Sequence, residues 1–193
     1  MRVSGDNLAA ERGGRSVFSG VSFAVAGGGL LAVTGPNGAG KSTLLRLIAG
    51  FIEPVAGRLA VEPDDVGLSY LGHLDGLKAA LTVRENLAFW REVGGGSGNV
   101  ATALDRLGLG TAIDLPVGVL SAGQQRRVAI ARLLLSKRPL WLLDEPATAL
   151  DAAAERTLGG LLGEHVASGG MAIVATHRPL PITPTGTLEL GSA

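Results

Sequence analysis

The sequence predicts an α/β fold with a mostly parallel central sheet, on three observations. Short apolar runs that suit buried strands, such as Leu30–Thr34 and Met171–Thr176, alternate along the chain with stretches of helical spacing. A glycine-rich loop, Gly35–Ser42, joins the first of these runs to a helical stretch. Hydrophobic residues fill 46% of the 193 positions and aromatic residues only 4%, so aliphatic side chains must make the core. A chain of this length suits one domain with room for subdomains.

The charge balance and the lack of cysteine exclude several classes of function. Seventeen basic residues match seventeen acidic ones, so the chain lacks the basic excess of a general nucleic-acid binder, and we expect no nucleic-acid partner. Without cysteine there is no disulfide framework, thiolate nucleophile or thiolate metal site. The uncharged stretch 17–40 is broken by glycines and polar residues, and Met1–Asp6 lacks the apolar core of a secretion signal. We therefore expect contact with a membrane only through a partner.

The first third of the chain predicts short strands. We expect strands at Val17–Phe18, Val21–Val25, Leu30–Thr34, Gly57–Val61 and Val66–Leu71. The second of them alternates large apolar with smaller residues, as a half-buried strand does. The last leads back toward the central sheet.

The middle of the chain predicts helices. Thr82 and the glutamate three residues later form a capping-box pattern that begins a helix running through Trp90. Phe89 and Trp90 are expected as core anchors, because large apolar residues at helical spacing usually pack inward. The glycine run 94–98 predicts a mobile surface loop, and 100–107 a short helix.

The last third returns to alternating strands and helices. Ser121 and Gln124 again have capping-box spacing and predict a helix to about Ser136. Beyond it we expect a strand at 139–144, a helix at 152–165, a strand at 171–176 and an edge strand at 187–190. The early strands and the middle helices then form subdomains apart from the parallel sheet.

The glycine-rich loop fits the phosphate-binding pattern G-x-x-x-x-G-K-[ST], with a strand before it and a helix after it. Glycines let successive backbone N–H groups turn toward an anion, and the helix start and a lysine add positive charge. A serine hydroxyl can hold Mg²⁺. An ordinary glycine-rich turn is the alternative, which this context disfavours. The candidate phosphate ligands are Gly35, Pro36, Asn37, Gly38, Ala39, Gly40, Lys41, Ser42 and Thr43.

Two carboxylates end the apolar strand that follows the long helix. Asp144 stands where the carboxyl end of a buried strand meets the edge at which the phosphate loop opens, so it can hold Mg²⁺ beside Ser42. Glu145 projects from the other side of the chain and can polarise the attacking water. The bland alternative is an aspartate that caps a helix.

A second helix start, Leu120–Gln124, has exposed N–H groups and a small residue at Gly123. It is either a plain capping box or a second anion site. Two anion sites in one chain could serve two ligands, or one ligand shared across a dimer.

In kind and in order these motifs resemble those of the ABC-type ATPases. The resemblance rests on GPNGAGKST at 35–43, LSAGQ at 120–124, LWLLDEP at 140–146, ALD at 149–151 and His177 after a strand, and it spans essentially the whole chain. It implies a P-loop NTPase fold in a single ATP-binding domain, 1–193. That domain would carry an N-terminal antiparallel β subdomain and a helical subdomain of roughly 74–137 inserted in the core.

The same resemblance implies a homodimer that binds ATP and Mg²⁺. Two ATP molecules would lie head-to-tail between two such domains. Ser121, Gly123 and Gln124 would face the γ-phosphate held by the partner's loop, and Asp151 would lie at the dimer seam. His177 would touch the γ-phosphate of its own subunit, as a catalytic residue beside Glu145.

Two positions depart from the family pattern. His73 stands where the family usually has a glutamine that touches Mg²⁺ and water and faces the membrane partner. Its hydrogen-bonding pattern changes with protonation near neutral pH. Arg12 is nearest the place of the aromatic residue that stacks on adenine; a guanidinium can also stack, though base selectivity is then less defined.

The segments YLGHLDGLK at 70–78, LTVRENL at 81–87 and LSAGQQRRVAIARLLLS at 120–136 also resemble the CcmA family, the ATP-binding subunits of the cytochrome c maturation complex. That resemblance implies a CcmB-like membrane permease as partner, ATP-driven release of a haem-loaded chaperone, and a peripheral place on the cytoplasmic face of the bacterial inner membrane. The alternatives are the ATPase subunit of another ABC transporter, and a soluble ABC ATPase acting on nucleic acid or ribosomes.

Overall fold

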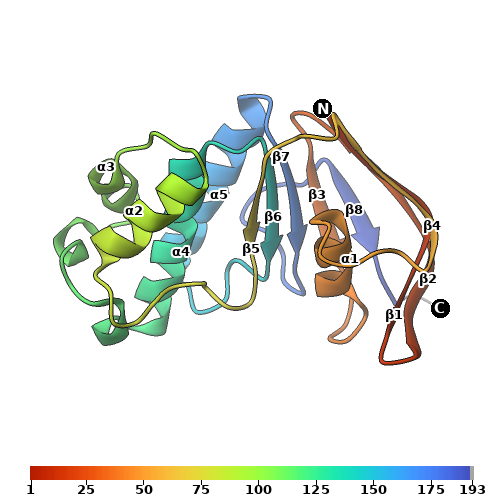
Figure 1. Ribbon diagram of the computed structural model, residues 1–193, viewed down its shortest axis with the longest axis horizontal. Helices are drawn as coiled ribbons and strands as arrows, with labels where there is room; N and C mark the ends of the chain where they lie inside the picture. Colours follow the sequence, from red (N-terminus) through yellow and green to blue (C-terminus); the bar gives the residue numbers. More distant parts are fainter. Residues whose placement is uncertain (192–193) are drawn as a thin grey trace.

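The computed structural model describes residues 1–191, so the last two positions of the expected domain 1–193 lie outside the described residues. Within that span the chain forms one parallel sheet, one antiparallel sheet and a group of helices (Figure 1). This arrangement confirms the predicted α/β class. Among the same residues, no helix is both long enough and apolar enough to span a bilayer.

The parallel sheet has the strand order β5-β6-β7-β3-β8. Its strands are β5 (Leu68–Leu71), β6 (Leu140–Asp144), β7 (Met171–Ala175), β3 (Leu30–Thr34) and β8 (Gly186–Glu189). Every pairing is parallel, so the carboxyl ends of all five strands meet at one edge. The phosphate loop follows β3, Asp144 ends β6 and His177 follows β7, so the topology brings all three to the same edge.

Alternation along the central strands divides the interior into two cores. Leu140 and Leu142 of β6 pack on the side of α1 (Lys41–Ile48), whereas Trp141 and Leu143 pack against the helices on the opposite face. Figure 1 shows α1 on one side of the parallel sheet, and α4 (Ala122–Ser136) with α5 (Ala152–Ala167) on the other. A strand buried on both faces needs a continuous apolar run, which explains the LWLL sequence before Asp144.

The antiparallel sheet has the order β2-β1-β4 and packs beside α1 (Figure 1). Its strands are β1 (Arg2–Arg12), β2 (Arg15–Ala26) and β4 (Ala56–Glu62). The two short strands expected at 17–18 and 21–25 are one continuous strand, and no range predicted β1. The pairing of β1 shifts between Gly5 and Leu8, and Asn7 there has a φ of 50°. Such a bulge breaks the period of two, which hides the strand from pattern reading.

Both predicted capping boxes are present. In each, the hydroxyl of Thr82 or Ser121 accepts the backbone N–H three residues on, and the side chain of Glu85 or Gln124 accepts the N–H of the capping residue. These boxes begin α2 (Val83–Val93) and α4. Between the two helices lie α3 (Val100–Asp105) and two 3₁₀ turns, η1 (Gly110–Ala112) and η2 (Val117–Val119). The surface loop predicted at 94–98 is present, and its mobility stays a prediction. A Cβ on Gly96 would collide with the carbonyl of Leu135, so the glycine run packs against the end of α4.

Two adjacent glycines in α5 should respond oppositely to alanine. A Cβ on Gly159 would lie 2.7 Å from the Pro181 carbonyl oxygen, whereas nothing lies within 4 Å of a Cβ on Gly160. We expect Gly159→Ala to lower the free energy of unfolding by about 1–3 kcal/mol through overpacking. We expect Gly160→Ala to raise it by roughly 0.5–1 kcal/mol, since alanine loses less backbone entropy in a helix. Urea unfolding of the two variants measures both, and equal shifts of one sign would contradict the packing of 181 on α5.

Candidate functional site

The phosphate loop turns sharply between β3 and α1 because its glycines are crowded by other segments. Gly35 has a φ of 135°, and a Cβ there would collide with the carbonyl of Leu190, just after β8. Gly40 has a φ of 98°, and its Cβ would lie 2.7 Å from side-chain carbons of Val17 and Phe18 on β2. Both positions lie in the left-handed half of φ space, which glycine adopts without strain. Both sheets therefore shape the loop.

Lys41 begins α1 and turns its side chain back over the loop. Its residue is only 7% exposed, and Nζ donates to the carbonyl oxygens of Gly35 at 2.8 Å and Pro36 at 3.1 Å. An ammonium has three N–H donors, so one of them is available to a further acceptor. Ser42 and Thr43 are half-buried in the first turn, while Pro36, Asn37 and Gly38 are exposed at the tip. The glycine turn, the lysine and the start of α1 therefore lie together, in the arrangement that would suit an anion.

Asp144 is buried at the carboxyl end of β6, close to the root of the loop. It pairs in register with Ala175 of β7, and Ala175 pairs with Val33 of β3, two residues before Gly35. Two strand spacings place the backbones of Asp144 and Val33 about 10 Å apart. The pKa of Tyr70 is raised, mainly by burial and also by the negative charge of Asp144, whereas Arg46 acts to lower this pKa. Asp144 therefore lies at the sheet edge where a phosphate-bound metal would sit.

Glu145 and His177 form a pair at the same edge. His177 Nδ1 donates to Oε1 of Glu145 at 2.9 Å, since an ionised carboxylate only accepts. The Glu145 N–H donates to the Ala175 carbonyl at 2.9 Å. Glu145 has a φ of 47°, a conformation that costs a non-glycine residue roughly 1–3 kcal/mol and that clusters at functional sites. The structure joins the two residues that the sequence proposed separately.

Arg126 is the residue that sequence reasoning missed. It lies on the buried face of α4, one helical turn before Ala129 and Ile130, and it is 4% exposed. Its guanidinium donates to the backbone carbonyls of Asp144 and Glu145 at 2.8 and 2.9 Å. A charged residue at a core-facing helical position was the signal that could have identified it.

The second helix start does not meet the phosphate loop of its own chain. Ser121 is exposed, and a Cβ on Gly123 would lie 2.6 Å from the carbonyl oxygen of Ala149, which has a φ of 63°. Asp151 follows this contact and caps α5, accepting the N–H of Ala154 at 2.8 Å. Figure 1 shows α4 and α1 on opposite sides of the parallel sheet. Ser121, Gly123, Gln124 and Asp151 therefore form a second cluster around the starts of α4 and α5.

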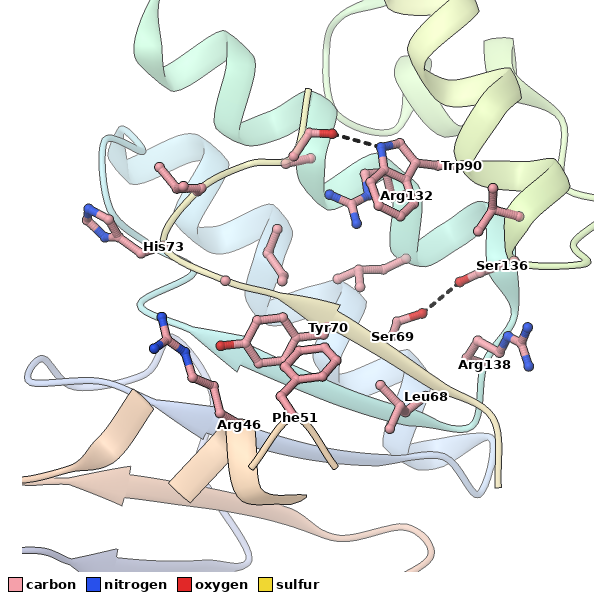
Figure 2. A pocket seen from close by; sticks show the side chains of 18 residues that line it. Arg46, Phe51, Leu68, Ser69, Tyr70, His73, Trp90, Arg132, Ser136 and Arg138 are labelled. Carbon is pink, nitrogen blue, oxygen red and sulfur yellow. Dashed lines mark hydrogen bonds between the residues drawn. The ribbon is translucent and has the colours of Figure 1, made fainter. Parts of the chain in front are cut away.

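His73 follows β5 and is exposed at the rim of a groove of about 740 Å³ between α2, α4 and β5 (Figure 2). Trp90 lines this groove with its indole N–H donated to the Gly76 carbonyl, and Arg132 stacks on its ring at 3.6 Å. Burial lowers the pKa of Arg132 to about 10 despite the opposing charge of Asp75, so Arg132 is still charged at neutral pH. The expectation of core anchors is wrong: Phe89 is 48% exposed and Trp90 forms a groove wall.

Arg12 lies at the end of β1, exposed and paired with Arg15 across the hairpin. Val17, half-buried beside Gly40, is an apolar neighbour of the phosphate loop that sequence reasoning did not identify.

The donor set suits magnesium held with a nucleotide. Among residues 1–191, no three His, Cys, Asp or Glu side chains gather as a metal-ligand cluster. Magnesium often takes one or two carboxylates together with substrate phosphates and waters. Ser42 and Asp144 beside a phosphate loop match that chemistry, and they fit Mg²⁺ that arrives with ATP.

Comparisons with known proteins identify the family of this chain. The family profile described as ABC transporter matches residues 18–148. A cytochrome c biogenesis ATP-binding export protein CcmA from Mesorhizobium japonicum is 54% identical over 190 residues, which cover 94% of each chain. Among solved structures, an ABC transporter ATP-binding protein from Pyrococcus furiosus has a TM-score of 0.86 at 21% identity, covering 98% of each chain. A bacterial Atm1-family ABC exporter with ATP bound has a TM-score of 0.78 at 31% identity, with 92% of this chain matched to 34% of that one. The chain belongs to the ABC transporter family of ATP-binding proteins, in the CcmA group.

Proposed function

We propose that this chain is the ATP-binding and ATP-hydrolysing subunit of a cytochrome c maturation complex, in which ATP drives haem export or the release of a haem-loaded chaperone. One observation carries the proposal. The sequence identity to a protein named for cytochrome c biogenesis is 54%, and the match covers 94% of both chains. The match therefore includes the parts of the chain outside the nucleotide site.

The proposed chemistry assigns one role to each residue of the sheet edge. Lys41 and the loop N–H groups bind the β- and γ-phosphates, and Ser42 and Asp144 hold Mg²⁺. Glu145 polarises the attacking water, and His177 orients Glu145 through Nδ1 while its Nε2 faces the γ-phosphate. The buried position of Asp144 and the short His177–Glu145 contact support these roles.

The proposed active form is a head-to-tail homodimer. Within one chain, Ser121 caps the start of α4, on the opposite side of the parallel sheet from α1 (Figure 1). The exposed N–H groups of that helix start suit a γ-phosphate held by a second copy, with Gly123 and Asp151 at the seam. Arg12 and Val17 would lie toward the adenine base of the bound ATP.

The proposed membrane partner is a CcmB-like permease that docks in the groove beside His73, with the segment 74–137 acting as an inserted helical subdomain. Three large apolar side chains line this groove while remaining exposed, namely Phe51, Leu74 and Val93. Such a concentration of exposed apolar surface is typical of a protein interface. The subunit would then sit peripherally on the cytoplasmic face of the inner membrane.

Leu74 tests the docking surface because its residue is 84% exposed. We expect Leu74→Asp to abolish co-purification of the chain with its membrane partner and to stop cytochrome c maturation in complemented cells, because a carboxylate would have to be desolvated at the interface. ATP binding by the full chain should not change. Leu115→Asp, at another exposed leucine, is the matched control.

The identity of the captured partner separates the alternatives. A permease whose loss leaves cytochrome c maturation intact would assign the chain to another ABC transporter. Capture of ribosomes or salt-sensitive binding to nucleic acid would assign it to a soluble ABC ATPase. Normal co-purification of Leu74→Asp would place the docking surface elsewhere.

A further inference from the structure

Arg126 uses every hydrogen-bond donor that a guanidinium has. Nη2 donates to the carbonyls of Asp144 and Glu145 at 2.8 and 2.9 Å, and Nε to that of Pro146 at 3.2 Å. Nη1 donates to the Gly72 carbonyl at 3.0 Å and to Oδ1 of Asp75 at 2.7 Å. These five bonds match the five N–H donors of arginine. A side chain from α4 thus joins two segments at the ends of neighbouring strands, 144–146 at the end of β6 and 72–75 after β5.

Three of the five acceptors are consecutive carbonyls around Glu145. A non-glycine residue in the left-handed region persists only where its surroundings hold it. The Glu145 peptide is held on one side by its N–H bond to Ala175 and on the other by Arg126. The orientation of this peptide determines where the Glu145 carboxylate lies, so the carboxylate can hold a water in a fixed position only while the peptide stays fixed.

We propose that Arg126 is a positioning residue for hydrolysis, which holds the Glu145 peptide in its active orientation and makes that orientation depend on the loop 72–76. The proposal rests on the proposed role of Glu145 as the residue that polarises water. Arg126 touches backbone carbonyls and Asp75 rather than the phosphate loop, so it should affect turnover and leave ATP binding alone.

The loop 72–76 connects this clamp to the groove. Asp75 binds Arg126 through its carboxylate and accepts from Arg132 Nη1 through its backbone carbonyl at 2.5 Å. Arg132 stacks on Trp90, and Trp90 donates to Gly76 (Figure 2). The contacts run without a gap from the groove wall to the Glu145 peptide. A partner segment that shifts this loop would therefore shift the carboxylate.

Arg126→Lys tests the proposal, because lysine keeps the charge but has three donors for five acceptors. In the full chain, purified with its membrane partner, we expect kcat for ATP hydrolysis to fall about tenfold while KM and ATP affinity keep their wild-type values. Asp75→Asn should lower kcat less, about threefold, since an amide accepts a weaker hydrogen bond than a carboxylate. The control is Arg84→Lys. Arg84 lies on α2 and forms an exposed ion pair with Asp114, so this change should leave kcat unchanged.

A second comparison separates positioning from simple loss of structure. In the Glu145→Gln background Arg126→Lys should lower the residual rate no further, because both changes act through one group. A wild-type kcat in Arg126→Lys would overturn the proposal, and so would a loss of ATP affinity equal to the loss of kcat. If Arg126→Lys does not fold, a wild-type kcat in Asp75→Asn overturns it instead. Retained hydrolysis in Glu145→Gln alone would refute the assigned role of Glu145, which is a different result.

Discussion

Glu145→Gln should bind ATP as well as the unchanged chain and hydrolyse it at least about a hundredfold more slowly, because a general base typically contributes 10²–10⁴-fold. Glutamine has the shape of glutamate, and its side-chain oxygen can still accept from Nδ1 of His177. The amide cannot take a proton from water. The change therefore removes the chemistry and keeps the geometry.

The measurement is steady-state phosphate release together with equilibrium ATP binding on the same preparation. Glu62→Gln is a matched control, because Glu62 is exposed at the end of β4 on the antiparallel sheet. Phosphate release close to the wild-type rate would mean that another residue activates the water. Loss of ATP binding would instead indicate a disturbed sheet edge, and melting temperatures would identify that case.

Lys41→Ala should lower ATP affinity by about ten- to a hundredfold. A hydrogen bond to a charged group is worth roughly 1.5–3 kcal/mol, and each 1.4 kcal/mol is tenfold in affinity. In the proposed complex the one N–H of Lys41 that the loop carbonyls leave available bonds to a phosphate, and losing this bond corresponds to about ten- to a hundredfold in affinity. The carbonyls of Gly35 and Pro36 also lose their donor, which loosens the loop.

Filter binding with labelled ATP measures the effect directly. Lys41→Met keeps the buried aliphatic stem without the charge, and it should lose nearly as much affinity as the alanine variant if charge is the cause. Lys78→Ala, at an exposed lysine, is the control. Unchanged affinity in Lys41→Met would show that the loop N–H groups alone bind the phosphates.

Local patterns predicted most of the fold. The capping boxes at Thr82 and Ser121 depend on residues three positions apart, and the structure confirms both. The apolar run that ends at Asp144 also identified an interior strand, because burial on both faces requires a continuous run of apolar residues.

Features that depend on distant partners could not be predicted in this way. Trp90 has the spacing of a core residue, but periodicity does not say what covers a helix face, and here the face borders a groove. Arg126 bonds to residues 51 and 54 positions earlier in the chain, and such pairings leave no spacing signal. The same holds for His177 and Glu145, whose order along the sequence suggested two roles but not one hydrogen-bonded pair.

The position of β3 between β7 and β8 has a consequence for folding during synthesis. The strand that carries the phosphate loop is made within the first 34 residues, yet both of its neighbours come from residues 171–189. The carbonyl that crowds Gly35 belongs to Leu190. Contacts of such long sequence separation form late, because loop closure must precede them. A ribosome-bound chain that ends before this residue therefore contains the whole nucleotide-loop sequence without the two strands that hold it in place.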